Sequence, residues 1–253
     1  MGKRRRRSTS DAWWKMEIGG MPVWGILGSV ALLTVMAFGT IASIPPAPTA
    51  DPNRTTAPVP SFAFDDPPET TSPHVAFLGD SYTFGTGRSE GSENRWTTIV
   101  SNALAWDEER FAVGGTGYVQ GDSYTNRVGL VIAAAPDVVI VSGGRNDWRV
   151  ADQVEAAATT VFSQLRDALP EATIIATNPW WDDDPAPAEM TFVSEAVRSA
   201  ADATGIAFVD IGQPLEGHPE YLSEDGVHPN DDGYRVIADA VEPLLRELVP
   251  ATT

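Results

Sequence analysis

Short apolar segments alternate with amphipathic ones over the last two thirds of this chain. Those at residues 75–78, 138–141 and 173–176 are continuous apolar or β-branched runs, too short for helices. Continuous rather than alternating runs are typical of strands that are buried on both faces, as in a parallel sheet. With two weaker segments, they predict strands at residues 74–79, 110–113, 137–142, 173–177 and 206–211.

Between these strands, apolar residues recur at helical spacing. The alternation of strands and helices predicts an α/β fold with helices on both faces of a parallel sheet, and ligands bind such folds at the carboxyl ends of the strands. The expected helices are at about residues 93–105, 123–134, 150–168, 189–203 and 230–248.

Polar, glycine-rich stretches follow the predicted strands. Because the carboxyl ends of parallel strands meet at one edge of a sheet, we expect these stretches to converge on a single site. They are Gly79-Asp80-Ser81, Gly114-Gly115-Thr116-Gly117, Gly143-Gly144-Arg145-Asn146-Asp147 and, before the last helix, Asp225-Gly226-Val227-His228.

One long apolar segment precedes all of these elements. Residues 21–44 contain no charged side chain. As a helix they would reach about 36 Å at ~1.5 Å per residue, enough to cross a ~30 Å hydrocarbon core. The basic cluster within residues 1–20 predicts that this end stays in the cytoplasm. We therefore expect a single-pass membrane anchor, with the rest of the chain outside the cell membrane.

A cleavable signal peptide is the alternative to this anchor, because residues 47–50 are mostly small. However, the apolar segment is longer than the ~7–15 residues usual in signal peptides, and prolines surround the possible cleavage site. An uncleaved anchor is therefore favoured. Residues 45–73 contain nine prolines and predict an extended linker without a core, which leaves residues 74–250 as one outer domain.

Charge narrows the function of this outer part. Of the chain's 17 Lys and Arg, six fall in residues 1–20. The remaining residues therefore contain eleven basic side chains and 33 of the 35 acidic ones. So acidic a surface repels nucleic acid and anionic lipid headgroups. The chain has no cysteine for disulfides or thiolate metal sites. We interpret the acidic runs at residues 182–184 and 231–232 as a solvated loop and a helix N-terminus, rather than as a cation site.

Serine, histidine and carboxylate side chains occur in the polar stretches. Ser81 would lie on a tight turn after a buried strand, the rigid support that a nucleophile needs. Asp225 and His228 are three residues apart in a turn-rich segment, which can bring the carboxylate to Nδ1 and leave Nε2 to accept a proton from Ser81. The alternative base is His218, whose near upstream carboxylate is Glu216. We favour His228 as the base, because the turn-rich segment contains both the histidine and its carboxylate, Asp225.

Neutral hydrogen-bond donors accompany these groups. The amide of Asn146 can donate without ionising, as an oxyanion requires. Backbone N–H groups at Ser81 and Gly115 would complete an oxyanion hole, since glycine lets the main chain approach closely. Trp180 and Trp181 follow the fourth predicted strand, where we expect them to form a pocket wall for a sugar or acyl group.

With these motifs, residues 74–248 resemble the SGNH hydrolase superfamily, also called GDSL esterases and lipases. The family's four blocks occur in order: Gly79-Asp80-Ser81, Gly115 (or Gly114 in the other register), Gly144-Arg145-Asn146-Asp147 and Asp225-Gly226-Val227-His228. The chain departs from the family pattern in two places. Tyr82 replaces the usual leucine after the serine, and no asparagine precedes the second-block glycine.

The resemblance implies a flavodoxin-like α/β/α sandwich with a five-stranded parallel sheet, in agreement with the strand and helix pattern. It also implies that Ser81 is the nucleophile and that Asp225 and His228 complete the triad. Ser81, Gly115 and Asn146 would supply the oxyanion hole. No metal or organic cofactor is implied.

We therefore expect an extracytoplasmic serine esterase that forms an acyl-enzyme and releases the acid to water. Its tether would keep it near the cell envelope, so the expected substrate is an ester on envelope carbohydrate, such as an acetylated polysaccharide. Two alternatives remain open. One is an acyltransferase that passes the acyl group to a sugar hydroxyl, and the other is a non-catalytic envelope-binding module on a degenerate esterase fold.

The apolar segment generates the first testable prediction. The full-length protein should sediment with membranes and resist carbonate extraction, and protease added to intact spheroplasts should degrade its outer domain. Protection of that domain would contradict the orientation. Recovery of a mature, secreted chain that starts near residue 51 would instead support a cleaved signal peptide.

Overall fold

The computed structural model describes residues 17–18, 21–22, 72–91 and 93–250. The chain divides into two compact units, Met1–Asp65 and Asp66–Thr253. In the first unit, β1 (Glu17–Ile18) pairs antiparallel with β2 (Met21–Pro22), so the predicted membrane helix does not begin at Met21. Residues 23–44 and nearly all of the Pro-rich linker lie outside the described residues. In the described part of the chain, no helix is long and apolar enough to cross a membrane.

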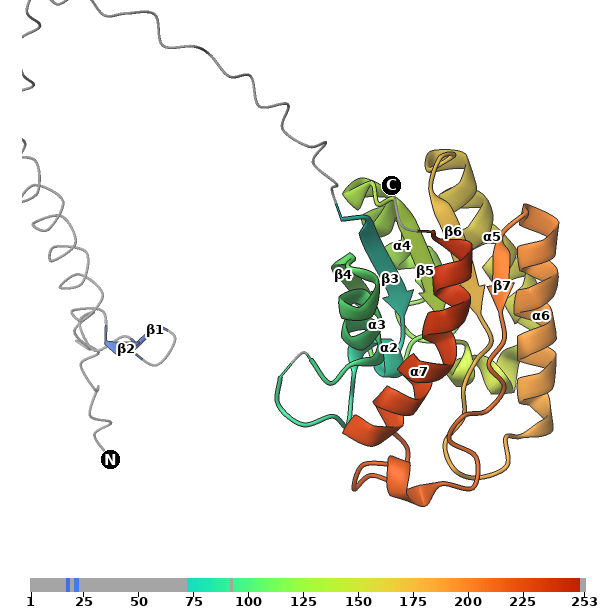
Figure 1. The fold of residues 1–253 in the computed structure, drawn as a ribbon. Helices are drawn as coiled ribbons and strands as arrows, with labels where there is room; N and C mark the ends of the chain where they lie inside the picture. The colour runs from blue at the N-terminus through green and yellow to red at the C-terminus, as the bar shows by residue number, and fades with distance from the viewer. Residues whose placement is uncertain (1–16, 19–20, 23–71, 92, 251–253) are drawn as a thin grey trace, which may run out of the picture. The chain divides into compact units, whose positions relative to one another are not determined.

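The second unit is built on a five-stranded parallel sheet with the strand order β4-β3-β5-β6-β7 (Figure 1). This order confirms the predicted flavodoxin-like sheet, in which the chain changes direction across the sheet between β3 and β5. The strands are β3 (His74–Gly79), β4 (Asp107–Ala112), β5 (Val138–Ser142), β6 (Thr173–Thr177) and β7 (Ala207–Val209).

The two edge strands differ most from the prediction. β4 begins three residues earlier than expected, because Glu108 and Glu109 interrupt its apolar pattern and only pairing with β3 identifies them as strand residues. An edge strand tolerates such charges, since one side of it is unpaired. Glu108 accepts hydrogen bonds from the hydroxyls of Thr97 and Thr98 at 2.6 and 2.7 Å. β7, at the other edge, is shorter than predicted.

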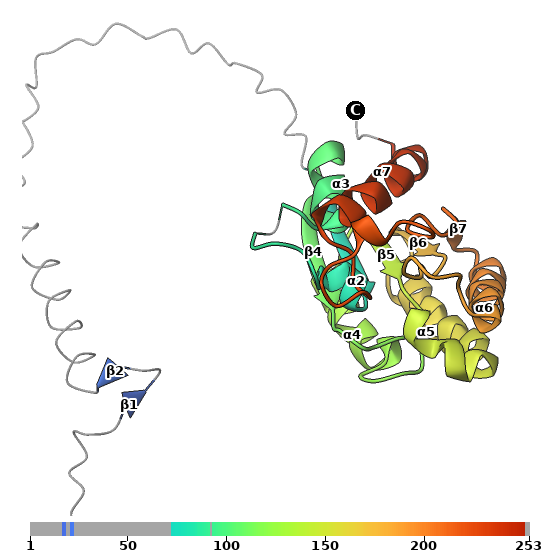
Figure 2. The same ribbon diagram turned by 90° about the horizontal axis from the view of Figure 1, so that it is seen from below.

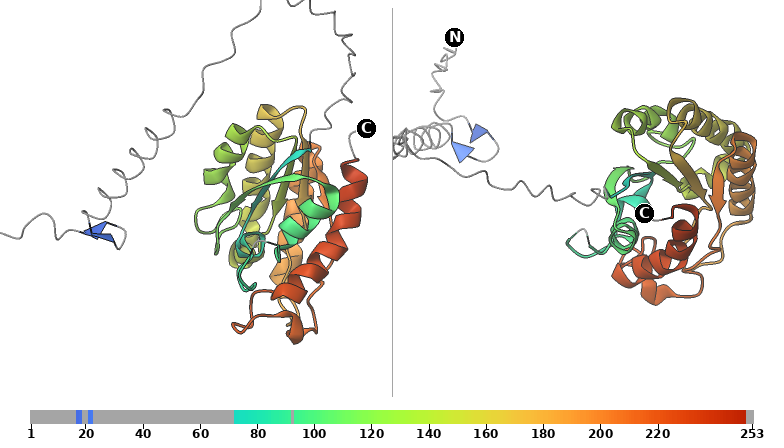
Figure 3. Two further views of the ribbon diagram at one scale, coloured as in Figure 1. Left: turned by 60° about the vertical axis from the view of Figure 1, so that its left-hand side comes forward. Right: turned by 45° about the horizontal axis from the view of Figure 1, so that its top comes forward.

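Helices cover both faces of the sheet (Figures 2 and 3). On one face α3 and α7 pack together, and on the other α5 packs against α4 and α6. The helix predicted from about residue 150 begins only at Val154, because a 3-10 segment, η3, occupies the preceding residues. The bounds are α3 (Trp96–Leu104), α4 (Tyr124–Ala134), η3 (Arg145–Gln153), α5 (Val154–Ala168), α6 (Ala188–Thr204) and α7 (Asp231–Leu248), with the short α2 (Ser81–Phe84) and η4 (Pro219–Tyr221) in the connections.

Trp180 belongs to the core between the sheet and the α3–α7 layer. Its side chain is only 3% exposed, and its ring packs edge-on against that of Trp96 at 5.3 Å. Its indole N–H donates to Asn178 Oδ1 at 3.1 Å. The expectation that Trp180 forms a pocket wall is therefore wrong, whereas the neighbouring Trp181 is half-buried and can still do so.

Pairing aligns three carboxyl ends at one level of the sheet. Gly79, the last residue of β3, pairs with Ala112 at the end of β4 and with Ser142 at the end of β5. Three of the four polar stretches of the sequence therefore leave the sheet side by side, next to the point where the chain changes direction.

The contrast between the two adjacent tryptophans can be tested by stability. Trp180→Ala should lower the unfolding free energy by roughly 3–5 kcal/mol, because it leaves a large cavity in the core. Trp181→Ala should lower it by about 1 kcal/mol or less, since its ring is half-exposed. Urea denaturation of the full-length variants measures both values, and equal losses would contradict the different placements.

Candidate active site

Ser81 lies on a tight turn between β3 and the short helix α2. Gly79 allows this turn, because a Cβ there would lie 2.1 Å from Thr83 Oγ1 and 2.8 Å from the carbonyl oxygen of Ser142. Asp80 caps the helix by accepting a hydrogen bond from the Tyr82 N–H at 2.9 Å. Ser81 is thus held on a rigid support at the carboxyl edge of the sheet, as the sequence predicted.

Asp225 and His228 form a closely bonded pair in the loop before α7. His228 Nδ1 and Asp225 Oδ2 are 2.6 Å apart, and Asp225 Oδ1 accepts from the N–H groups of Val227 and His228 and from Ser223 Oγ, each at 2.9 Å. Burial would raise the pKa of Asp225, but the bonds from His228, Val227 and Ser223 hold it well below its usual range. The carboxylate is therefore ionised near neutral pH, so Nδ1–H donates to it and Nε2 is left as an acceptor.

His228 is the histidine that contacts the Ser81 turn. Its ring lies 6.0 Å from that of Tyr82, the residue after Ser81. Among the described residues no hydrogen bond joins Ser81 to His228, and such bonds often form only when substrate is bound. The alternative base, His218, instead stacks on Tyr221 and lies 2.9 Å from Glu220 Oε1.

The glycine loop after β4 passes beside the serine. A Cβ on Gly114 would lie 3.7 Å from that of Ser81. Gly115 has a φ of 73°, which L side chains rarely adopt, and nothing lies within 4 Å of where its Cβ would be. The main chain therefore lies next to Ser81 at Gly114 and is open at Gly115, one residue further along the loop.

Asn146 is fixed by a side-chain hydrogen bond to the same loop. Its amide nitrogen donates one proton to the Thr116 carbonyl at 2.8 Å, which leaves the second proton of the amide for another acceptor. The structure thus brings Ser81, the glycine loop and Asn146 to one edge of the sheet, as expected for an oxyanion hole.

Asp147 clamps the glycine loop, a role that the sequence did not reveal. It is fully buried and accepts from the backbone N–H groups of Tyr118, Val119 and Gln120 at 2.7, 3.2 and 2.9 Å. Burial raises the pKa of this carboxyl, and the three backbone bonds oppose that rise. Gly117 packs so tightly on it that a Cβ would lie 2.2 Å from Asp147 Oδ2. The signal that could have indicated this role is the position of the acidic residue, directly after Asn146.

Arg127 is a second buried group that sequence reasoning missed. Its guanidinium donates to the carbonyl oxygens of Phe111 and of Gly79, the latter at 3.1 Å, and to Thr116 Oγ1 at 2.7 Å. It therefore ties the ends of β3 and β4 to the glycine loop. No local pattern marks it, because an arginine in an amphipathic helix is usually on the solvent side.

Arg145 and Asp182 join the loop after β6 to the site. Arg145 Nη2 lies 3.0 Å from Asp182 Oδ2, and both side chains are largely buried. The guanidinium carbon lies over two rings, 4.7 Å from the centroids of both Tyr82 and Trp181. The interpretation of residues 182–184 as a solvated loop is therefore wrong for Asp182, and Trp181 borders the site through Arg145.

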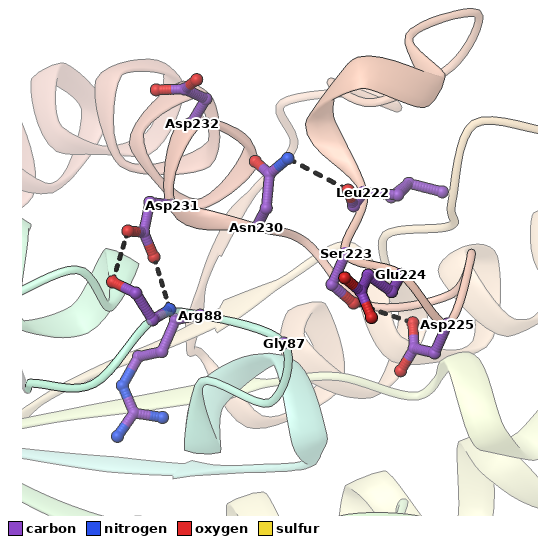
Figure 4. Close-up of a pocket in the computed structure, with 10 residues that line it drawn as sticks. Gly87, Arg88, Leu222, Ser223, Glu224, Asp225, Asn230, Asp231 and Asp232 are labelled. Carbon is purple, nitrogen blue, oxygen red and sulfur yellow. Dashed lines mark hydrogen bonds between the residues drawn. The ribbon is translucent and has the colours of Figure 1, made fainter.

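An open acidic hollow lies beside Asp225, the carboxylate partner of His228, and Figure 4 shows the residues that line it. It has a volume of about 700 Å³. Asp231, at the start of α7, accepts there from Ser89 N–H at 2.8 Å and from Asn94 Nδ2 at 3.1 Å. In the part of the chain that the structure describes, no three acidic, histidine or cysteine side chains are grouped to hold a metal. The hollow is lined by Gly87, Arg88, Ser89, Leu222, Ser223, Glu224, Asp225, Asn230, Asp231 and Asp232.

The fold is a parallel α/β sandwich. One edge of its sheet carries the serine turn, the glycine loop, the Gly-x-Asn-Asp block and the Asp–His turn, and this combination defines an SGNH-type hydrolase. The chain matches the family model of the GDSL-like Lipase/Acylhydrolase family over residues 77–236, and it belongs to that family.

Similar proteins agree with this assignment. The chain is 33% identical over 189 residues to "GDSL lipase Rv0518" of Mycobacterium tuberculosis, covering 68% of this chain and 80% of the relative. Among solved structures, TesA shares 19% identity at a TM-score of 0.58, over 70% of this chain and 99% of TesA. A family two carbohydrate esterase from Cellvibrio japonicus shares 17% identity at a TM-score of 0.57, over 70% of this chain and 62% of that one. These two structures are similar in fold.

Asp80 carries an unusual carboxyl group directly before Ser81. It is buried, and its Oδ2 has no hydrogen-bond partner among the described residues. Burial raises its pKa to about 6, although the Tyr82 N–H bond and the charge of Arg145 oppose the rise. The folded protein therefore holds this proton more tightly than the unfolded chain, and stability is lost as pH rises from about 4 to 6.

Asp80→Asn should remove this pH dependence and keep the helix cap, since asparagine caps helices as well as aspartate does. The unfolding free energy of the variant relative to wild type should therefore rise by about 3 kcal/mol between pH 3.5 and pH 7. Denaturant titrations at the two pH values measure this difference. A relative stability that is the same at both would show that Asp80 titrates as it does in water.

Proposed function

We propose that this protein is a membrane-anchored, extracytoplasmic serine esterase that hydrolyses acyl esters on cell-envelope carbohydrate. The observation that carries the proposal is the Asp225–His228 pair, which contacts the residue next to Ser81 at the carboxyl edge of the sheet. In this reading Asp225 orients the ring, His228 is the general base, and Ser81 is the nucleophile.

The reaction proceeds through an acyl-enzyme. His228 Nε2 takes the Ser81 proton as Oγ attacks the ester carbonyl, and the backbone N–H groups of Ser81 and Gly115 with the Asn146 amide stabilise the oxyanion. The protonated histidine then gives its proton to the leaving alcohol. Water, activated by the same base, attacks the acyl-enzyme and releases the acid, which restores Ser81.

The residues around the candidate active site support a carbohydrate as the alcohol component of the substrate ester. The hollow beside Asp225 is lined by four carboxylates and one arginine, which attract hydroxyl donors and repel anionic headgroups. Trp181 offers a half-exposed indole, a surface against which a sugar ring can stack. The similar fold from Cellvibrio japonicus is a carbohydrate esterase, and the membrane tether would keep this domain near envelope glycans.

The triad is tested by paired histidine variants with nitrophenyl esters of graded acyl length. Ser81→Ala should abolish turnover with the fold intact. His228→Ala should lower kcat by roughly 10³-fold or more, because the nucleophile loses its base. His218→Ala is the matched control, since this histidine also pairs with a carboxylate but does not contact the Ser81 turn, and it should stay within about twofold of wild type.

Two outcomes would contradict the proposal. A larger loss for His218→Ala than for His228→Ala would mean that the other histidine is the base. If envelope oligosaccharide is added to the acyl-enzyme and acylated sugar becomes the main product, the protein is an acyltransferase rather than a hydrolase.

A further inference from the structure

Tyr82 connects the serine turn to the turn that contains Asp225 and His228, which is far away in the sequence. It follows Ser81, at the position where the family usually has leucine, and its side chain is 2% exposed. Its hydroxyl donates to the backbone carbonyl of Val227 at 2.7 Å, across 145 residues of chain. Val227 lies between Asp225 and His228 in the Asp–His turn.

The Asp–His turn, residues 225–228, is held in shape by hydrogen bonds within residues 223–228. Asp225 accepts from Val227 N–H, His228 N–H and the histidine ring, and Ser223 N–H donates to the His228 carbonyl at 2.8 Å. These bonds orient the ring relative to the carboxylate. They do not determine where the turn lies relative to Ser81, and its Asp225 side chain is 47% exposed.

Placement of the turn depends on contacts across the site. Among the hydrogen bonds of residues 72–91 and 93–250, the one from Tyr82 to Val227 is the one that joins residues 79–85 to residues 225–228. The Tyr82 ring also packs against the His228 ring at 6.0 Å. One side chain, next to the candidate nucleophile in sequence, therefore contacts the turn both by its ring and by its hydroxyl.

Tyr82 is itself held firmly enough to act as a fixed point. The guanidinium of Arg145 lies over its ring at 4.7 Å, and Tyr234 packs edge-on against it at 6.5 Å. Burial, opposed by the charge of Arg145, raises the pKa of its hydroxyl, so this group stays protonated and remains a donor near neutral pH. A leucine could fill much of this space but could not donate to Val227.

We propose that Tyr82 is a positioning residue, whose hydroxyl holds the preassembled Asp225–His228 pair over Ser81. This inference rests on the triad of the proposed function. It requires that loss of the hydroxyl lowers the rate of Ser81 attack without changing substrate binding, because a displacement of about 1 Å between base and nucleophile can cost on the order of 100-fold in rate.

The test compares Tyr82→Phe with Tyr234→Phe in the full-length protein. Each change removes one hydroxyl from a buried tyrosine of the same core, and each removes a hydrogen bond to a backbone carbonyl, 2.7 Å to Val227 and 2.6 Å to Thr86 respectively. Each should therefore lower Tm by a similar amount, about 2–4 °C. The Tyr234 bond ends outside the Asp–His turn, which makes this variant the matched control for stability.

Tyr82→Phe should lower kcat for a nitrophenyl ester by roughly 10- to 100-fold and leave KM within about twofold. Its reaction with a fluorophosphonate, which reports attack by Ser81 alone, should slow by the same factor. Tyr234→Phe should keep kcat and fluorophosphonate reactivity within about twofold of wild type. The downfield proton signal of the His228–Asp225 hydrogen bond should persist in both variants, because the bonds inside the turn are unchanged.

The inference is overturned if the two variants lose kcat equally, since the effect would then be one of stability. It is also overturned if Tyr82→Phe changes only KM, or if it abolishes the downfield signal, which would mean that Tyr82 binds substrate or assembles the pair. Failure of the proposed function looks different, because the wild-type protein would then neither hydrolyse the esters nor react with the fluorophosphonate.

Discussion

The register of the three parallel strands β4, β3 and β5 is the constraint on which the rest of the site depends. Backbone pairing of Gly79 with both Ala112 and Ser142 ends these strands at one level, so that their loops start as neighbours. Buried Arg127 then bonds to the carbonyls of Gly79 and Phe111 and to the Thr116 hydroxyl, which holds the two strand ends to the glycine loop. A shift of one residue in this pairing would turn every side chain of a strand to the opposite face, and the serine turn and the glycine loop would separate.

Carboxylates do most of the remaining positioning, and their surroundings distinguish their roles. Asp80, Asp147 and Asp225 all accept backbone N–H bonds, the first and third within their own turns and Asp147 from the loop that follows Gly117. Burial raises the pKa of the first two, whereas the bonds to the exposed Asp225 lower its pKa and keep it charged beside His228. The same residue type therefore serves as a structural clamp where it is buried and as the partner of a proton acceptor where it is exposed.

The rings around Ser81 connect the chemistry to the surface. Tyr82 contacts both His228 and Arg145, and Arg145 in turn contacts Trp181. The proposed base, the residue next to the proposed nucleophile and the half-exposed indole thus belong to one packed row. Substrate that stacks on Trp181 would therefore contact one end of the same series of packed side chains that reaches His228.

By itself the sequence determined the class of fold, the three central strands and the local turns, because each depends on residues close together in the chain. Buried apolar runs predict β3, β5 and β6, and a carboxylate three residues before a histidine can close its own turn, as Asp225 and His228 do. The tertiary structure decided what depends on distant partners: the charged start of β4, the burial of Trp180 and not Trp181, and the role of Arg127. It also decided that Tyr82 reaches Val227, since no local pattern can show which carbonyl lies opposite a side chain 145 residues away.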